Sequence, residues 1–291
     1  MTFNDDADIK GGRVSKRGRN TAIGAGVGGV GLIAVVLIGQ LLGVDLTPLL
    51  GGAGGTSSGS SDGTPLTQCT TGSQANTDID CRMKAAAASL DTYWSGEVDG
   101  YTSPQPLVIF DGSTNTGCGG ATTDVGPFYC PTDQTIYIDT AFYDQLKSQF
   151  GATGGPLAQL YVIAHEWGHH IQNITGIMKN LTLQQTGPTS DSVRLELQAD
   201  CFAGAWVGAA QTTKDENGVP FLQPVTQAEI ADALNAAAAV GDDHIQQTTQ
   251  GQVNPESFTH GTSAQREKWF NAGLNGGPQR CDTFGASASN L

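Results

Sequence analysis

Apolar and polar positions follow helical spacing over most of the chain after residue 66, with short strand-like runs between them. Two runs rich in β-branched and aromatic residues predict strands, at Leu107–Phe110 and Thr135–Asp139. The helical spacing predicts five helices, at Arg82–Trp94, Pro156–Asn173, Ser192–Val207, Gln227–Val240 and Ser263–Ala272. We therefore expect an α+β domain that is mainly helical and contains a small sheet.

One long apolar stretch, residues 21–46, lies near the N-terminus. No charge interrupts Thr21–Val44, which is long enough for a helix across a hydrocarbon core about 30 Å thick. A cleaved signal peptide is the alternative, but the stretch is longer than the usual apolar core of such a peptide. The sequence therefore favours a single transmembrane anchor at 21–46.

The residues on either side of this stretch differ in composition. Five basic residues precede it, namely Lys10, Arg13, Lys16, Arg17 and Arg19. By the positive-inside rule, residues 1–20 are expected to form a basic cytoplasmic tail, with the rest of the chain outside the cell membrane. A Gly/Ser-rich linker is expected at 47–65, followed by one folded domain over 66–291.

The charge and the cysteine content limit the possible partners and the possible location of the chain. The chain has 14 basic and 28 acidic residues and a formal net charge of −14, which argues against a nucleic-acid partner. All six cysteines follow the apolar stretch, as expected for disulfides in an exported domain. Of the 15 possible pairings, closure between sequence neighbours favours Cys69–Cys81 and Cys118–Cys130, which leaves Cys201 with Cys281.

The segment LYVIAHEWGHHIQ contains His165, Glu166 and His169 in the spacing H-E-x-x-H. On a helix, residues four apart share a face, so both imidazoles can reach one Zn²⁺ ion. Glu166 then lies beside the metal, where it can act as general base for a water molecule. The alternative is an ordinary helix with two hydrogen-bonded histidines and a surface glutamate.

A second pair of candidates follows in the segment RLELQADCFAG. Glu196 and Asp200 are four residues apart, on one face of an otherwise apolar predicted helix. Glu196 is our candidate for the third zinc ligand, which leaves a fourth position open. Asp200 is our candidate for the acceptor that orients a ligand histidine. A solvated acidic pair is the alternative.

These motifs together resemble known metallopeptidases. H-E-x-x-H followed by E-x-x-x-D resembles the gluzincins, and ELQADCFAG is similar to a segment of the CAAX prenyl proteases and HtpX-like proteases. The stretches GPFYCPTDQTIYID, AHEWGHHIQ, SVRLELQADCFAGAW, GDDHIQ and SFTHGTSAQREKWF resemble more closely a neutral zinc metallopeptidase family of bacteria. This resemblance covers roughly residues 66–284. It implies a zincin-like catalytic domain with a Zn²⁺ cofactor behind an N-terminal membrane anchor.

Three further residues are candidates for roles near the metal. His260 and Arg266 are six residues apart and resemble the H-P-x-x-x-x-R element of the membrane-linked relatives, with glycine in place of proline. Either side chain could stabilise an oxyanion, and the alternative is a capping histidine with a structural arginine behind the site. His244, in GDDHIQ, is a second candidate for the same role. Its alternative is a loop histidine bonded to adjacent acids.

Other polar positions carry weaker expectations. His170 is rotated off the ligand face, so we expect it behind the site or at the surface. The run Thr135–Asp139 is either an edge strand that pairs with an extended peptide or a plain core strand. Asp242 and Asp243 are expected in a solvated loop rather than in a calcium site.

The sequence thus predicts a zinc metalloendopeptidase at the outer face of a cell membrane, acting on a peptide or protein substrate with Glu166 as general base. Two alternatives remain open. One is a membrane-tethered binding or envelope protein with a structural zinc ion, and the other is a zinc amidase that acts on cell-wall peptides. Neither the substrate specificity nor the oligomeric state follows from the sequence.

Overall fold

The structure, a computed structural model, describes residues 3–18 and 63–291. Its larger sheet has the strand order β2-β1-β3-β7-β6. The strands are β1 Val14–Lys16, β2 Thr64–Pro65, β3 Leu107–Phe110, β6 Phe128–Cys130 and β7 Thr135–Asp139. β3 is parallel to β1 and β7, whereas β2 and β6 are antiparallel to their neighbours and form the two edges. A separate two-stranded sheet pairs β4 Ser113–Thr116 with β5 Gly119–Thr122.

Helices are the main type of regular structure in the described residues, so the mixed and mainly helical fold class is confirmed. The five predicted helices are present as α4 Ile79–Glu97, α6 Pro156–Ile174, α7 Asp191–Ala209, α8 Gln227–Ala239 and α10 Ser263–Gly276. Shorter helices that the hydrophobic pattern does not predict are α3 Gly72–Thr77, α5 Phe142–Phe150 and α9 Asp242–Gln250. Single 3-10 turns lie at Thr123–Val125, Ile177–Asn180, Pro255–Ser257, Pro278–Arg280 and Ala288–Asn290.

Local sequence explains where the helices of the site begin. Pro156 occupies the first turn of α6, where a missing backbone N–H costs no hydrogen bond. α7 begins after Ser190, whose side chain accepts a hydrogen bond from the backbone N–H of Val193. Thr262 and Gln265 form the predicted capping box at the start of α10.

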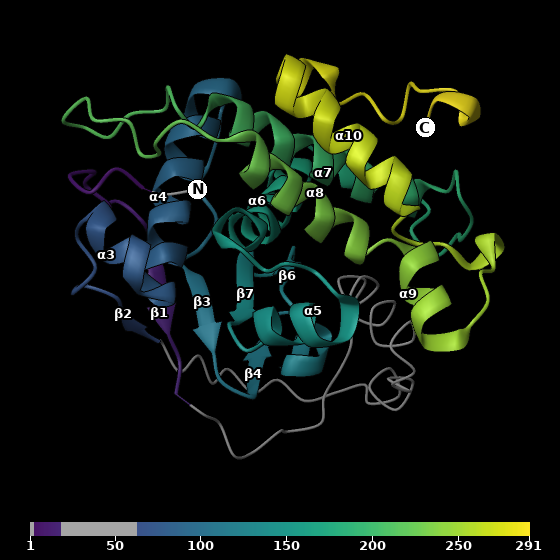
Figure 1. The fold of residues 1–291 in the computed structure, drawn as a ribbon, viewed down its shortest axis with the longest axis horizontal. Helices are drawn as coiled ribbons and strands as arrows, with labels where there is room; N and C mark the ends of the chain where they lie inside the picture. Colours follow the sequence, from purple (N-terminus) through teal and green to yellow (C-terminus); the bar gives the residue numbers. More distant parts are fainter. Residues whose placement is uncertain (1–2, 19–62) are drawn as a thin grey trace.

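The sheet and the helices form two adjacent regions of the molecule. Figure 1 shows the strands in the lower part of the view and the helices α6, α7, α8 and α10 above them. α7 packs against both α6 and α10, and its contact with α10 is very close. A Cβ atom at Gly273 of α10 would lie 1.8 Å from the carbonyl oxygen of Cys201 in α7, so only glycine fits there.

Residues 3–18, which fall within the expected tail at 1–20, are part of the folded domain. Phe3, Ala7, Ile9 and Val14 are buried in the same hydrophobic core as the alanines of α4. β1 lies inside the sheet, between β2 and β3. This short segment joins the domain because its apolar side chains pack on one face of α4 and its strand β1 pairs with β3. A basic composition alone did not reveal either contribution.

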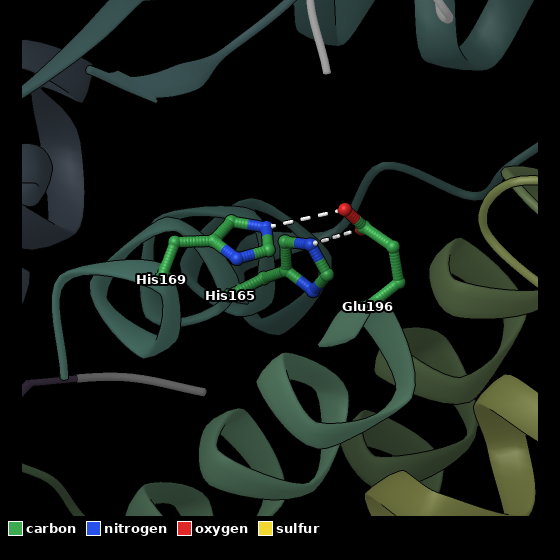
Figure 2. Close-up of side chains that lie close together, drawn as sticks. All are labelled: His165, His169 and Glu196. Atoms are coloured by element: carbon green, nitrogen blue, oxygen red, sulfur yellow. Dashed lines mark hydrogen bonds and ion pairs between the residues drawn. The ribbon is translucent and has the colours of Figure 1, made fainter. Parts of the chain in front are cut away.

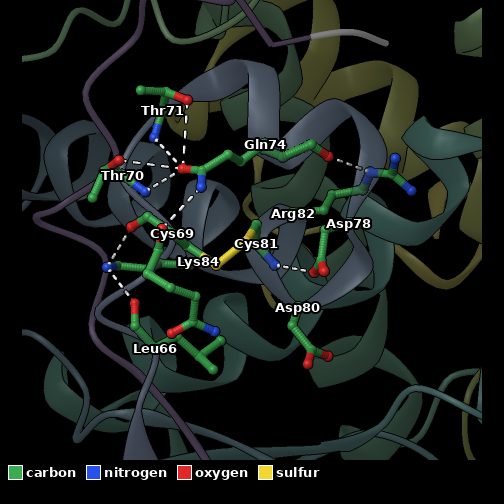
Figure 3. Close-up of a disulfide and its surroundings, with 12 residues drawn as sticks. Leu66, Cys69, Thr70, Thr71, Gln74, Asp78, Asp80, Cys81, Arg82 and Lys84 are labelled. Carbon is green, nitrogen blue, oxygen red and sulfur yellow. Dashed lines mark hydrogen bonds between the residues drawn. A yellow bond between two sulfur atoms is a disulfide. The ribbon is translucent and has the colours of Figure 1, made fainter.

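Three disulfides join the cysteines in the pattern favoured by sequence neighbours, which confirms that pairing. They are Cys69–Cys81, Cys118–Cys130 and Cys201–Cys281. Figure 3 shows the first of them, which ties the loop before α3 to the first turn of α4. Beside it, the buried Lys84 ammonium donates hydrogen bonds to the carbonyl oxygens of Leu66 and Cys69, each at 2.8 Å.

The predicted transmembrane anchor at 21–46 lies outside the described residues, as does most of the linker at 47–65. Among residues 3–18 and 63–291, no helix combines the length and the apolar character needed to cross a bilayer.

Candidate metal centre

Three predicted ligands converge between α6 and α7. Nitrogen and oxygen atoms of His165, His169 and Glu196 that could hold a metal ion all lie within 4.8 Å of one another, and all three residues are buried. Nε2 of His165 lies 3.1 Å from Oε2 of Glu196, and Nε2 of His169 lies 3.5 Å from Oε1. Figure 2 shows both rings on α6 directed toward the carboxylate that α7 presents.

Close packing of the two helices makes this convergence possible. Gly168 lies between the two ligand histidines, and a Cβ atom there would approach the Cα atom of Ala199 in α7 to 3.0 Å. α6 therefore approaches α7 within the same turn that carries His165 and His169. Because Glu196 is one turn before Ala199 on α7, its side chain reaches both rings.

The donor set and its electrostatics fit a zinc ion. Two imidazoles and one carboxylate are a common ligand set of catalytic zinc sites, which keep a fourth position open. Burial alone would favour a neutral Glu196, but His169 and His260 hold the pKa of this carboxyl well below its usual range. Burial likewise disfavours a charged His165, yet Asp200 and Glu196 raise the pKa of this imidazole. The surroundings therefore favour positive charge between these side chains, which a cation would supply.

Asp200 contacts the ring of His165, the first candidate ligand. Its Oδ1 atom lies 2.8 Å from Nδ1 of His165, which leaves Nε2 of that ring to face Glu196. Arg266 binds both carboxylate oxygens of Asp200, with Nε at 2.8 Å from Oδ2 and a terminal nitrogen at 2.9 Å from Oδ1. The Tyr161 hydroxyl also donates to Asp200. Arg266 therefore acts behind His165, through Asp200.

The ring of His169, the second candidate ligand, is held by Gln172, a residue outside the predicted site. Nδ1 of His169 lies 2.8 Å from the side-chain oxygen of Gln172, one turn later on α6. The Gln172 amide in turn donates to the carbonyl oxygen of Leu195 at 2.7 Å and to the side-chain oxygen of Gln198. The signal was present in the sequence, since a glutamine three residues after a ligand histidine lies on the same helix face.

Glu166 is buried beside the ligands and lines the same cavity as they do. Burial raises the pKa of its carboxyl, while His169 and His165 oppose that shift. The backbone N–H of Tyr129 in β6 also opposes the rise of this pKa. Glu166 is therefore held between the ligand helix and the edge of the sheet. This position suits a group that must exchange a proton next to the metal.

His260 lies in the wall of the cavity and is buried there. Its Nδ1 atom is 2.9 Å from the Thr259 hydroxyl and 3.3 Å from Oδ1 of Asp242. Burial disfavours its charged form, but Glu196 and Asp242 raise the pKa of the ring. With Nδ1 engaged, Nε2 is the nitrogen that remains for a ligand in the cavity.

Asp242 does more than the solvated loop residue that we expected. It is completely buried at the first position of α9, and Oδ2 accepts hydrogen bonds from the backbone N–H groups of Thr259, His260 and Gly261 at 2.7, 2.7 and 2.9 Å. One carboxylate thus fixes the backbone that carries His260. The sequence motif GDDHIQ marked this region, but only the fold shows that its first aspartate matters.

The structure does not bring His244 into the site. Its ring is directed to the carbonyl oxygen of Phe150 at 3.1 Å, the residue is exposed, and it is absent from the cavity wall. His170 is fully buried away from the ligands, where it contacts the Tyr129 hydroxyl and the Thr102 carbonyl oxygen. It serves as a support between α6 and the sheet, not as a ligand.

The edge strand beside the site is β6 rather than the predicted run Thr135–Asp139. That run forms β7, which lies between β3 and β6, so the core-strand alternative is correct. Pro127, Phe128 and Tyr129 line the cavity next to the ligands. The three-residue run Phe128–Cys130 is too short to predict as a strand from its pattern alone.

The cavity over the candidate metal site has a volume of about 170 Å³. Its polar wall includes His165, Glu166, His169, Glu196, His260 and Arg266. The rest of the wall is largely apolar and includes Val125, Phe128, Phe142, Phe150, Val162, Leu195 and Ile245. A concave apolar site with a few convergent polar groups is the usual form of a substrate-binding site.

Comparison with known proteins agrees with this geometry. Residues 3–284 match the model of a family described as "Putative neutral zinc metallopeptidase". The chain is 51% identical over 227 residues to the uncharacterized protein Rv2575 of Mycobacterium tuberculosis H37Rv, covering 77% of each chain. It is 41% identical over 295 residues to the uncharacterized protein YpfJ of Escherichia coli K12, covering 97% of this chain and 96% of that protein.

No solved structure matches the chain. The family match spans nearly all of the sequence and includes the two histidines, Glu166 and Glu196. The chain therefore belongs to the neutral zinc metallopeptidase family.

Proposed function

We propose that the protein is a zinc-dependent peptidase of zincin-like architecture that hydrolyses peptide bonds in the cavity above α6. The observation that carries this proposal is the convergence of His165, His169 and Glu196 with a buried Glu166 beside them. A site that held zinc only for stability would gain nothing from a buried acid next to the ligands and an open cavity above them.

In the proposed reaction, the metal and the side chains of the protein have different roles. When bound, zinc supplies a Lewis acid for the peptide carbonyl and lowers the pKa of a water molecule. Glu166 accepts the proton of the attacking water on its carboxylate and then donates it to the leaving amine. Its raised pKa, caused first by burial, makes it a better proton acceptor than an exposed carboxylate.

His260 has the position of an oxyanion stabiliser. As the carbonyl oxygen gains negative charge, the Nε2–H group of His260 donates a hydrogen bond to it from the cavity wall. Asp242 and Thr259 hold the other ring nitrogen, so the ring is oriented before the substrate binds. Arg266 supports the ligand His165 through Asp200 and does not contact the reacting atoms in this scheme.

A peptide substrate would bind in an extended form along β6. This strand ends the sheet, and its residues Phe128 and Tyr129 line the cavity. Backbone pairing with a sheet edge binds a peptide without reading its sequence. Selectivity would then come from the apolar part of the cavity, which favours a large apolar side chain next to the cleaved bond.

The decisive experiment is Glu166→Gln in the full chain, with bound zinc and hydrolysis of unfolded casein measured on the same sample. We expect stoichiometric zinc in wild type and variant, and a loss of activity of about 10²–10⁴-fold in the variant. Glu256→Gln is the matched control, because Glu256 is exposed and outside the cavity.

Three results would overturn parts of the proposal. Full activity of Glu166→Gln would remove Glu166 from the mechanism. Zinc binding without chelator-sensitive cleavage of any peptide by the wild type would favour the binding-protein alternative, and cleavage of peptidoglycan fragments alone would favour the amidase.

A further inference from the structure

We infer that residues 3–18 and residues 63–291 lie on the same side of any membrane that the chain contacts. A single crossing by the apolar stretch 21–46 would separate them, so this stretch does not act as a single-pass anchor. The inference concerns the topology of the chain and is independent of the proposed peptidase activity. It differs from the expectation that residues 1–20 are cytoplasmic while the rest of the chain is exported.

The first observation is where the N-terminal segment leaves the domain and where the chain returns. β1 and β2 are antiparallel, with Ser15 opposite Pro65 and Lys16 opposite Thr64. Opposite Cα atoms in such a pair are about 5 Å apart. The ends of the intervening segment are therefore neighbours at one edge of the sheet, whereas the two ends of a membrane span are about 30 Å apart.

The second observation is how deeply the N-terminal segment is built into the domain. Phe3, Ala7 and Ile9 are at most 1% exposed and belong to the main core. The backbone N–H of Asn4 donates to the carbonyl oxygen of Phe221 at 3.0 Å, and that of Asp8 donates to the Asp215 carboxylate at 2.7 Å. These contacts join the first residues to a loop more than 200 residues away.

The third observation is the close contact between the backbone of the N-terminal segment and the backbone of the rest of the domain. A Cβ atom at Gly12 would lie 2.1 Å from the carbonyl oxygen of Lys84 in α4. A Cβ atom at Gly72 would lie 1.9 Å from the carbonyl oxygen of Asn4. The sequence thus has glycine at two points where the N-terminal segment and the rest of the domain touch backbone to backbone, as expected for one folded unit.

The basic residues that suggested a cytoplasmic tail have partners in the domain. Lys16 forms an ion pair with Asp80 at 2.6 Å. Arg17 donates to the Asn115 carbonyl oxygen at 2.8 Å and lies over the ring of Tyr137. These contacts account for part of the charge before the apolar stretch without a requirement for cytoplasmic retention. The family match also begins at residue 3, before that stretch.

A chain that crossed the membrane once and still made these contacts would have to return through the bilayer. The segment available for the return, residues 47–62, is rich in Gly and Ser. Its backbone groups would have no hydrogen-bond partners in hydrocarbon, at a cost of several kcal/mol for each group. A chain that crossed once and did not return would have to give up the core contacts of residues 3–18. This would expose β3 and one face of α4.

Accessibility of two engineered cysteines in intact cells tests the inference. Gly11→Cys marks the N-terminal segment, because a side chain at position 11 meets no atom within 4 Å. Val253→Cys marks the rest of the domain at an exposed position. The native cysteines are all in disulfides, so a membrane-impermeant maleimide should report only the new thiol.

We expect both single-cysteine variants of the full chain to react alike, either both in intact cells or both only after permeabilisation. Either result supports the inference that the two labelled segments lie in the same compartment. Reaction of Val253→Cys in intact cells while Gly11→Cys needs permeabilisation, or the reverse, would overturn the inference.

A cross-link provides a second measurement that does not depend on compartment. In the double variant Lys16→Cys/Thr64→Cys the new residues lie opposite each other in β1 and β2. After insertion of a protease site between residues 50 and 60, cleavage followed by denaturation without reductant should leave the N-terminal fragment attached until a reductant is added. The two single variants should release the fragment without reductant. Immediate release from the oxidised double variant would also overturn the inference.

Discussion

Asp200 is the residue on which the most interactions of the site depend. It is fully buried, contacts the ligand His165, and neutralises Arg266, which is itself almost fully buried. Although burial alone would favour its neutral form, Arg266 and His165 hold the pKa of Asp200 below its usual value. Removal of one partner from a buried ion pair leaves the other charge without compensation.

The change Asp200→Ala should therefore lower the free energy of unfolding by about 3–5 kcal/mol. It should also weaken zinc binding by about 10–100-fold, because His165 loses the acceptor that orients it. Chemical denaturation and zinc titration measure the two effects. Asp144→Ala, at an exposed position of α5, should change stability by less than about 0.5 kcal/mol. Equal effects of the two substitutions would contradict the assigned role.

Asp242 makes stability depend on pH in the acid range. Although burial opposes ionisation, the contact with His260 and the backbone N–H groups lower the pKa of Asp242 below its ordinary value. The unfolded chain therefore takes up a proton at a higher pH than the folded one. The stabilisation by the ionised carboxylate is complete above the ordinary aspartate pKa of about 4 and is lost as pH falls through the lower folded value.

We expect Asp242→Asn to lose stability less steeply than the wild type as the pH falls below about 4. Urea unfolding at a series of pH values measures this slope. Asp99→Asn, a substitution at an exposed position beyond the end of α4, is the control and should keep the wild-type slope. An unchanged slope in Asp242→Asn would show that this carboxylate is not preferentially ionised in the folded state.

Among the elements, β1 shows how a short segment can be essential without being visible in the sequence pattern. It has three residues and pairs with β3, which begins more than 90 residues later. Adjacent glycines just before it differ sharply in their surroundings. Gly12 contacts α4, whereas nothing lies within 4 Å of a Cβ atom at Gly11.

Gly12→Ala should therefore destabilise the protein by about 1–3 kcal/mol, because the added methyl group has no space beside the Lys84 carbonyl. Gly11→Ala is the matched control and should leave the melting temperature nearly unchanged or slightly higher. Thermal unfolding of the full chain distinguishes the two. If both variants melted like the wild type, the N-terminal segment would not be packed on α4.

The long helices could be predicted because each carries an apolar face over several turns, as α6 and α7 do. The shorter helices were harder to predict from the sequence. α9 has the sequence DDHIQQTTQ, in which Ile245 is the single aliphatic residue, so no periodic apolar face marks it. Its position is fixed instead by contacts of Asp242 with the loop before α10 and of Asp243 with the first residue of that helix.

At the scale of the whole molecule, a metal that binds only the folded state should raise its stability. Zinc at about 100 times its dissociation constant should add about 2.7 kcal/mol to the free energy of unfolding. A chelator should therefore lower the melting temperature, and added zinc should restore it. Calorimetry of the full chain with and without chelator checks this prediction.

His165→Ala should abolish this response, since it removes one of three ligands. His244→Ala should retain it, because His244 lies outside the cavity. A chelator effect of wild-type size in His165→Ala would place the bound metal elsewhere in the protein.

The sequence by itself determined the local chemistry of the site. The four-residue spacing of His165 and His169, and of Glu196 and Asp200, fixes which side chains share a helix face, because the α-helix has a constant pitch. The disulfide partners Cys69–Cys81 and Cys118–Cys130 are likewise close in sequence. Such short-range relations need no knowledge of the remaining fold.

Tertiary structure alone decided which distant segments meet. It excluded His244, brought Asp242 behind His260, made β6 the edge strand, and placed residues 3–18 inside the domain. The physical reason is the same in each case. These contacts join segments whose separation along the chain carries no periodic signal, and they form because packing the whole core buries their apolar surfaces and satisfies their polar groups together.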